Sequence, residues 1–146
     1  MNISRFSDYS LRVLIYLSLN EDKLVTIKEI SDRYQISKNH LMKVVHHLSL
    51  NELITSIRGK NGGIKLKQTS IDINIGYVVR LIEKDSKLVE CFSQNNQCVI
   101  TSACELKFIF AQALEQFYLH LDQYTLNDLV NNQHNKQLNQ ILTISI

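Results

Sequence analysis

Apolar residues recur at helical spacing through the first third of the chain. The first such segment, residues 7–19, predicts an amphipathic helix. Thr26 and Glu29 then have the spacing of a capping box, which predicts a second helix through about Tyr34. Ser37 offers a further N-cap only a few residues later, so a third helix should follow after a tight turn. Two helices joined in this way are typical of a helix-turn-helix.

The helix predicted after Ser37 has an apolar side and a polar side. The apolar side is formed by Leu41, Val44, Val45 and Leu48. The opposite side carries Asn39, Lys43 and His46, with Met42 and His47 at its margins. The polar side has hydrogen-bond donors and no carboxylate that would repel phosphate. If this helix stood alone, the simpler interpretation of its polar side would be an ordinary solvated surface. The segment that follows the helix favours DNA binding instead.

A short β-hairpin is predicted directly after this helix. Residues 54–57 and 64–67 have strand character, and the turn between them contains three of the four glycines of the chain. Glycine permits positive φ at the tip, where Arg58 and Lys60 add two cations. A nucleotide-binding loop does not fit, because the G-x-x-x-x-G-K-[ST] spacing is absent and a strand follows. The pattern predicts a winged helix-turn-helix that binds double-stranded DNA.

The predicted architecture is mainly α with a small β-hairpin, and a long C-terminal dimerisation helix follows the winged domain. We expect a DNA-binding domain at 1–83, a cysteine-bearing loop at 84–104, a dimerisation helix and following segment at 105–130, and a flexible tail at 131–146 that is rich in Asn and Gln. The predicted DNA contacts are Ser37, Lys38, Asn39, Lys43, His46, Arg58, Gly59, Lys60 and Asn61. A homodimer would read an inverted repeat.

The dimer is inferred from an apolar stripe in the last predicted long helix. Its members are Leu106, Ile109, Phe110, Ala113, Leu114, Phe117 and Leu121. A stripe on a helix outside a complete small domain suits a dimer interface, and packing back on the same domain is the alternative. The charge also divides the chain, since residues 1–70 carry net +5 and residues 71–146 carry net −3. The basic front half is typical of a module that binds a polyanion, and the mildly acidic back half indicates a sensing or assembly module.

Composition excludes several classes of protein. Cysteine is too rare and odd in number for a secreted disulfide scaffold, and no apolar run approaches the length of a membrane span. We therefore expect a cytoplasmic protein with reduced thiols. No nucleophile elbow, Cys-His pairing or metal-hydrolase motif is visible, so an enzyme with a cysteine nucleophile is the weakest interpretation.

All three cysteines, Cys91, Cys98 and Cys104, fall in one predicted loop. The spacing is too wide for zinc knuckles, whereas iron-sulfur clusters accept wider spacing but usually take four ligands. His120 is too far along a continuous helix to complete the set. This leaves carboxylates as candidates, namely Asp8, Glu90 and Glu105. For Asp8 alone, the simpler interpretation is a helix-dipole contact and an ion pair with Arg12.

Several segments together resemble the NsrR family of nitric-oxide-sensing repressors, which shares a superfamily with IscR. They are MNISRFSDYSLR at the N-terminus, SKNHLMKVV, RGKNGGI, the three spaced cysteines and YTLNDLV near residue 130. The resemblance implies a four-iron or two-iron iron-sulfur cluster held by Cys91, Cys98 and Cys104. It implies that Asp8 of the other subunit is the fourth ligand, with Arg12 beside it. Nitric oxide would be the signal that releases DNA and derepresses nitrosative-stress genes.

Two alternatives stay open beside this one. IscR uses a histidine three residues after its last cysteine, where this chain has Lys107, and this difference favours NsrR over an IscR-like regulator of cluster biogenesis. A zinc-dependent or thiol-redox regulator would use the same cysteines, because three thiolates and one carboxylate also suit zinc.

Overall fold

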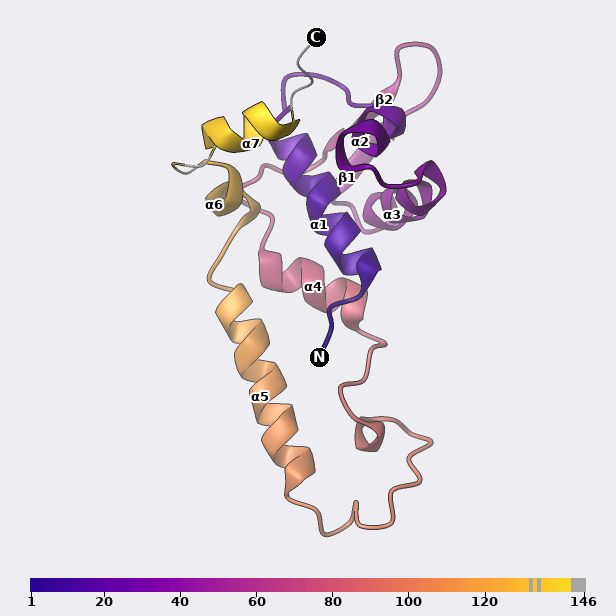
Figure 1. Ribbon diagram of the computed structural model, residues 1–146, viewed down its shortest axis with the longest axis vertical. Helices are drawn as coiled ribbons and strands as arrows, with labels where there is room; N and C mark the ends of the chain where they lie inside the picture. Colours follow the sequence, from indigo (N-terminus) through magenta and orange to yellow (C-terminus); the bar gives the residue numbers. More distant parts are fainter. Residues whose placement is uncertain (132, 134, 143–146) are drawn as a thin grey trace.

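The computed structural model describes residues 1–131, 133 and 135–142. Helix α1 (Arg5–Ser18) lies at the centre of the upper body in Figure 1 and packs against α3, α4 and α6. The Ser4 hydroxyl caps α1 by accepting a hydrogen bond from the Ser7 amide. The buried side chains of α1, including Val13, Leu14 and Leu17, form one side of the core.

Helices α2 (Ile27–Tyr34) and α3 (Lys38–Leu50) form the predicted helix-turn-helix. Thr26 caps α2 by accepting from the Glu29 amide, but the reciprocal half of the predicted capping box is not formed. The Glu29 carboxylate instead accepts from the hydroxyl of Tyr16 at 2.7 Å and from Nζ of Lys23 at 2.8 Å. The ammonium group of Lys23 and the hydroxyl of the buried Tyr16 therefore hold the carboxylate that the local pattern assigned to the helix cap.

The hairpin consists of β1 (Ile54–Ile57) and β2 (Gly63–Leu66), paired antiparallel with Ile54 opposite Leu66. Val25 joins its edge through a bridge to Ile64, so the hairpin is fixed to the segment that leads into α2. Helix α4 (Ile75–Glu83), capped by Asn74, closes the domain. These elements confirm the predicted winged helix-turn-helix.

The cysteine loop and helix α5 (Leu106–Leu121) extend away from the winged domain in Figure 1, with a short 3-10 turn η1 (Glu90–Phe92) at the start of the loop. The predicted apolar stripe of α5 divides between two environments. Phe117 and Leu121 pack partly against the core, whereas Leu106 and Ile109 stay exposed. One end of the stripe therefore contacts its own domain, and the other end leaves apolar side chains exposed to solvent.

A clamp joins α5 to α4. Arg80 donates from Nη1 to Oδ1 of Asp122 at 2.5 Å, and its guanidinium lies 4.7 Å from the ring centroid of Tyr118. Gly76 permits this approach, because a Cβ at that position would lie 1.9 Å from the same carboxylate oxygen. Asn74 also donates to the Asp122 carbonyl. The base of the α5 arm is thereby set against the winged domain.

Two further helices follow α5. Helix α6 (Leu126–Val130) begins with a complete capping box between Thr125 and Asp128 and buries Leu126 in the core. Helix α7 (Asn135–Leu142) occupies the described part of the predicted flexible tail. It differs from that expectation because Leu142 is buried with the core cluster, and this apolar contact stabilises a helix in an otherwise polar segment. The remaining tail residues, 132, 134 and 143–146, lie outside the described residues.

No helix in the part of the chain that the structure describes is long and apolar enough to cross a bilayer.

Candidate nucleic-acid interface and cysteine loop

Helix α3 presents the predicted DNA-contacting side chains to solvent. Lys38, Asn39, Lys43 and His46 are all exposed, while the opposite face is buried through Leu41, Val44, Val45 and Leu48. The Ser37 hydroxyl caps the helix by accepting from the His40 amide at 3.3 Å. Its own hydrogen stays available for donation to an acceptor such as a phosphate oxygen.

The wing carries its cations on a tightly constrained turn. Gly59 has φ 98° and Asn61 has φ 64°, and the Gly62 amide donates to the Gly59 carbonyl at 3.0 Å. Arg58, Gly59, Lys60 and Asn61 are all exposed, as the predicted wing contact requires. Neither Arg58 nor Lys60 forms an ion pair within the described residues, so both charges are free to meet phosphate.

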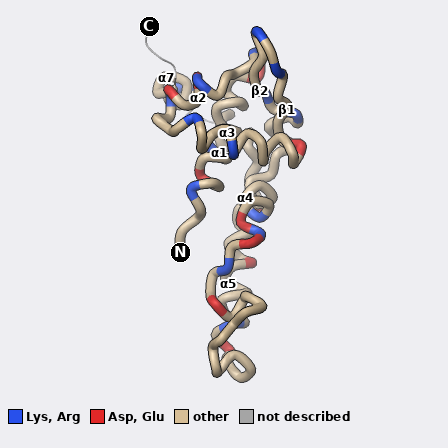
Figure 2. Tube along the Cα trace, turned by 90° about the vertical axis from the view of Figure 1, so that its right-hand side faces the viewer, with Lys and Arg blue, Asp and Glu red and all other residues tan. Residues whose placement is uncertain are grey.

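Helix α3 and the wing carry Lys and Arg residues and no carboxylate. Figure 2 shows Lys and Arg at the hairpin between β1 and β2. Residues 53–71, which contain the whole wing, include no Asp or Glu, and α3 includes none either. A surface of this composition attracts the phosphate backbone of DNA.

Helix α1 braces the reading helix through two ring contacts. Phe6 meets His47 edge to face with ring centroids 5.4 Å apart, and Tyr9 lies 6.1 Å from His40 by the same measure. Asp8 lies between these two contacts in the sequence of α1. A displacement of the start of α1 would therefore reach α3 directly.

Asp8 and Arg12 form a bidentate ion pair on the surface of α1. Arg12 donates from Nε to Oδ1 at 2.9 Å and from Nη2 to Oδ2 at 2.8 Å. The Asp8 side chain is 46% exposed. The hydrogen bond with Asp8 raises the pKa of Arg12, whose guanidinium lies 5.9 Å from the ring centroids of both Tyr9 and Tyr34. In a single chain, the carboxylate predicted as a ligand thus has a charged partner on its own helix.

The structure places Cys91, Cys98 and Cys104 on the loop between α4 and α5. Cys98 is exposed, the other two are half-buried, and all three are free thiols. Within the described residues, no three Cys, His, Asp or Glu side chains lie close enough to hold a metal ion. Three soft thiols on one segment fit an iron-sulfur cluster by donor chemistry, while the loop does not preassemble the ligand set.

The loop is held by its own polar side chains. Oε1 of Glu90 accepts from the Gln97 amide at 2.8 Å, and Asn96 donates to the Thr101 hydroxyl at 2.6 Å. Glu90, one of the alternative carboxylate candidates, therefore has a structural partner inside the loop. His120 packs on Tyr124 with ring centroids 5.5 Å apart.

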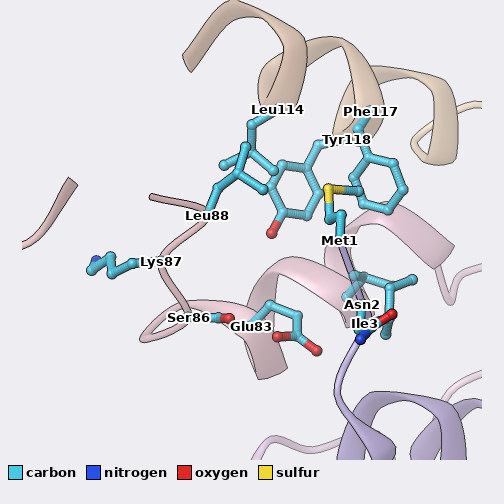
Figure 3. A pocket seen from close by; sticks show the side chains of 11 residues that line it. Met1, Asn2, Ile3, Glu83, Ser86, Lys87, Leu88, Leu114, Phe117 and Tyr118 are labelled. Carbon is cyan, nitrogen blue, oxygen red and sulfur yellow. The ribbon is translucent and has the colours of Figure 1, made fainter. Parts of the chain in front are cut away.

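A cavity of about 150 Å³ lies where the N-terminal segment, the end of α4 and α5 meet. Figure 3 shows the Met1 side chain pointing toward Phe117 and Tyr118, with the Glu83 carboxylate on the α4 side. Glu83 was not among the predicted site residues. Oε1 of Glu83 accepts from both Ser4 and Ser7, a link whose only sequence signal was a pair of serines at a helix start.

Comparisons with known proteins agree with this geometry. A family model described as Rrf2, iron-dependent transcriptional regulator, matches residues 3–132. A protein of Oceanobacillus iheyensis named HTH-type transcriptional regulator NsrR is 49% identical over 135 residues, covering 91% of this chain and 92% of that protein. The protein of the same name from Bacillus subtilis is 48% identical over 135 residues, covering 91% and 92%.

Solved structures show the same architecture. T. potens IscR superposes with a TM-score of 0.75 at 22% identity, covering 94% of this chain and 91% of that chain. CymR (YrzC), described as the global cysteine regulator of B. subtilis, superposes with a TM-score of 0.66 at 26% identity, covering 88% and 95%. These likenesses confirm the predicted fold class.

The sequence relatives confirm the resemblance to the NsrR family, and they are transcriptional regulators and not enzymes. The matched residues include α1, the helix-turn-helix, the wing, the cysteine loop and α5, which are the elements described above. The chain belongs to the Rrf2 family of iron-dependent transcriptional regulators.

Proposed function

We propose that this regulator is a cytoplasmic, homodimeric repressor that carries an iron-sulfur cluster and releases its operator in response to nitric oxide. The observation that carries the proposal is the placement of three free thiols on one loop outside a winged domain whose basic reading face is fully exposed. The names of the relatives and the description of the family as iron-dependent support it.

The DNA contacts divide by chemistry. Asn39 and Lys43 lie on the exposed face of α3 and would reach base edges in the major groove. Ser37 and Lys38, at the start of the same helix, would bind phosphate, and His46 would extend the contact along the groove. Arg58 and Lys60 would bind phosphates from the wing, with Gly59 and Asn61 shaping the turn that presents them.

A second copy of the chain would pair along α5. Leu106, Phe108 and Ile109 are exposed apolar side chains at the start of this helix. An exposed apolar stripe of this kind is removed from water when two helices pack together. Two winged domains related by a two-fold axis would read an inverted repeat, since protein and operator symmetry match.

Cys91, Cys98 and Cys104 would hold the cluster, and Asp8 of the other subunit would be the fourth ligand. When bound, the cluster would supply an iron that reacts with nitric oxide. Carboxylate oxygen is a harder ligand than thiolate, so Asp8 would be the weakest of the four attachments. Its exposed carboxylate can turn between a ligand position and the Arg12 guanidinium, which holds it in the single chain.

Anaerobic purification of the full chain tests the cofactor. The proposal predicts coloured protein that contains iron and acid-labile sulfide, and Cys91→Ser, Cys98→Ser and Cys104→Ser should each reduce both contents. Ser102→Ala, in the same loop and exposed, is the matched control and should keep them. Colourless protein with one zinc per chain would overturn the proposal in favour of a zinc regulator.

A further inference from the structure

Helix α3 exposes one large apolar side chain, Met42, beside the polar residues of its reading face. Met42 is 56% exposed, although the sequence pattern placed it at the margin of that face. It lies one turn from Asn39 and one turn from His46, and next to Lys43. Met42 is not among the side chains that pack on the core. Folding of the domain therefore does not explain a large apolar side chain at this position.

The position of Met42 along the helix is also informative. It lies in the first half of α3, and the N-terminal part of a recognition helix is the part that contacts base edges. Leu50 is the other exposed apolar residue of α3, 68% exposed, but it is the last residue of the helix. Of these two, Met42 is the one that shares its turn with the hydrogen-bonding residues Asn39 and Lys43.

The major groove offers one apolar group that such a side chain can recognise. Each base edge there presents hydrogen-bond donors or acceptors, and thymine alone adds a C5-methyl group. Methionine is flexible and polarisable, so it can follow a methyl group without a strict geometry. Asn39 suits adenine and Lys43 suits guanine, so neither of them accounts for a thymine methyl.

We propose that Met42 is a specificity-determining residue that selects thymine in each half-site through contact with its methyl group. The inference rests on the proposed DNA-reading role of α3. Residues one helical turn apart are about 5 to 6 Å apart, and base pairs are spaced by about 3.4 Å. The selected thymine therefore falls within about two base pairs of the bases that Asn39 and Lys43 read.

Selection followed by uracil scanning tests this inference. The full chain, purified anaerobically, first selects its site from duplexes with a randomised centre. Each thymine of the selected site is then replaced by uracil, which removes only the methyl group, and affinity is measured by fluorescence anisotropy. One thymine per half-site should show affinity about fourfold weaker, the size expected for one methyl group in an apolar contact.

Variants of α3 then identify the side chain that contacts this thymine methyl group. Met42→Ala should bind the thymine site several-fold more weakly and show no further loss with uracil at that position, while Met42→Leu should keep the uracil penalty. Leu50→Ala removes the other exposed apolar side chain of α3 and should keep it as well. Alanine favours helix and the position is exposed, so thermal melting should show an unchanged fold.

The outcomes separate the two claims. A selected site whose uracil penalty is the same in the wild type and in Met42→Ala overturns the role of Met42 and leaves DNA reading by α3 intact. A selected site with no methyl-dependent position also overturns it. Failure to enrich any sequence contradicts the DNA-reading function itself, and the inference falls with it.

Discussion

Glu83, the last residue of α4, accepts a hydrogen bond of 2.5 Å from the buried hydroxyl of Ser7 on α1. The same carboxylate oxygen accepts from the Ser4 hydroxyl at 2.6 Å and from the Ser4 amide at 2.9 Å. The start of α1, which bears Asp8, is thereby tied to the residue from which the cysteine loop leaves the winged domain. A displacement of the cysteine loop can therefore pass through Glu83 to the start of α1, and from α1 to the reading helix α3.

Replacing Glu83 with alanine should destabilise the protein by about 1 to 3 kcal/mol, because the buried Ser7 hydroxyl and the two Ser4 donors lose a charged acceptor. Urea unfolding measures the difference. Lys84→Ala, at the next and exposed position, is the control and should change stability little. Equal stabilities of the Glu83→Ala and Lys84→Ala variants would show that the link contributes nothing.

The same link predicts a pH dependence. Burial opposes ionisation of Glu83, but the Ser4 and Ser7 donors outweigh it and lower its pKa from the ordinary value of 4.5. A depressed carboxyl pKa stabilises the fold above the unfolded-state value and loses this contribution as the pH falls through the folded-state value. The stability difference between the wild type and Glu83→Gln should therefore be constant near pH 7 and shrink below about pH 4.5. A difference independent of pH would refute this assignment.

Gly76→Ala should destabilise the protein, although glycine to alanine within a helix ordinarily gains up to about 1 kcal/mol. The new Cβ would lie 1.9 Å from Oδ1 of Asp122 and 2.8 Å from its backbone nitrogen, which displaces the partner of Arg80. Thermal unfolding should show a lower midpoint, and the loss should be smaller when Gly76→Ala is made in an Asp122→Ala background. A raised midpoint for Gly76→Ala alone would contradict the clamp.

The wing should contribute to DNA binding mainly through phosphate contacts. Arg58→Ala and Lys60→Ala should each weaken binding on all sequences and reduce the slope of log affinity against log salt by about 0.9. Anisotropy at several salt concentrations measures both effects. Lys136→Ala, an exposed lysine on α7, is the control for total charge. A wing variant with the slope of Lys136→Ala would show that the wing does not contact phosphate.

Asp8→Ala should change the absorption spectrum of the anaerobically purified protein, because one proposed ligand is removed while the three thiols remain. Asp32→Ala removes the acid of another i,i+4 ion pair, Lys28 with Asp32, and serves as the control. The control should keep the wild-type spectrum. An Asp8→Ala spectrum and nitric-oxide response that match those of the control would show that Asp8 is not a ligand.

The sequence predicted the elements whose formation depends on local pattern. The helix cap at Ser37 and the glycine-rich wing are set by neighbours in the chain, and both are confirmed. The predicted capping contact of Glu29 is not formed, because its carboxylate binds Tyr16 and Lys23, which lie farther away in the sequence than Thr26.

Features that depend on tertiary contact were not predictable from one sequence. The division of the α5 stripe requires knowing that α4 covers one side of it, and α7 requires knowing that Leu142 finds a place on the core. The exposure of Met42 also follows from how α3 packs, since its position on the helical wheel alone placed it at a margin. The ligand set of the cysteine loop depends on a second subunit and stays a prediction.

In the proposed mechanism, the cysteine loop controls the position of the reading helix α3. The most direct test is an anaerobic titration of the loaded protein with nitric oxide, with absorbance and the anisotropy of labelled operator recorded on the same sample. DNA should be released in step with the spectral change. Operator that stays fully bound after the spectral change is complete, or that is released before any change occurs, would show that the loop does not control DNA binding.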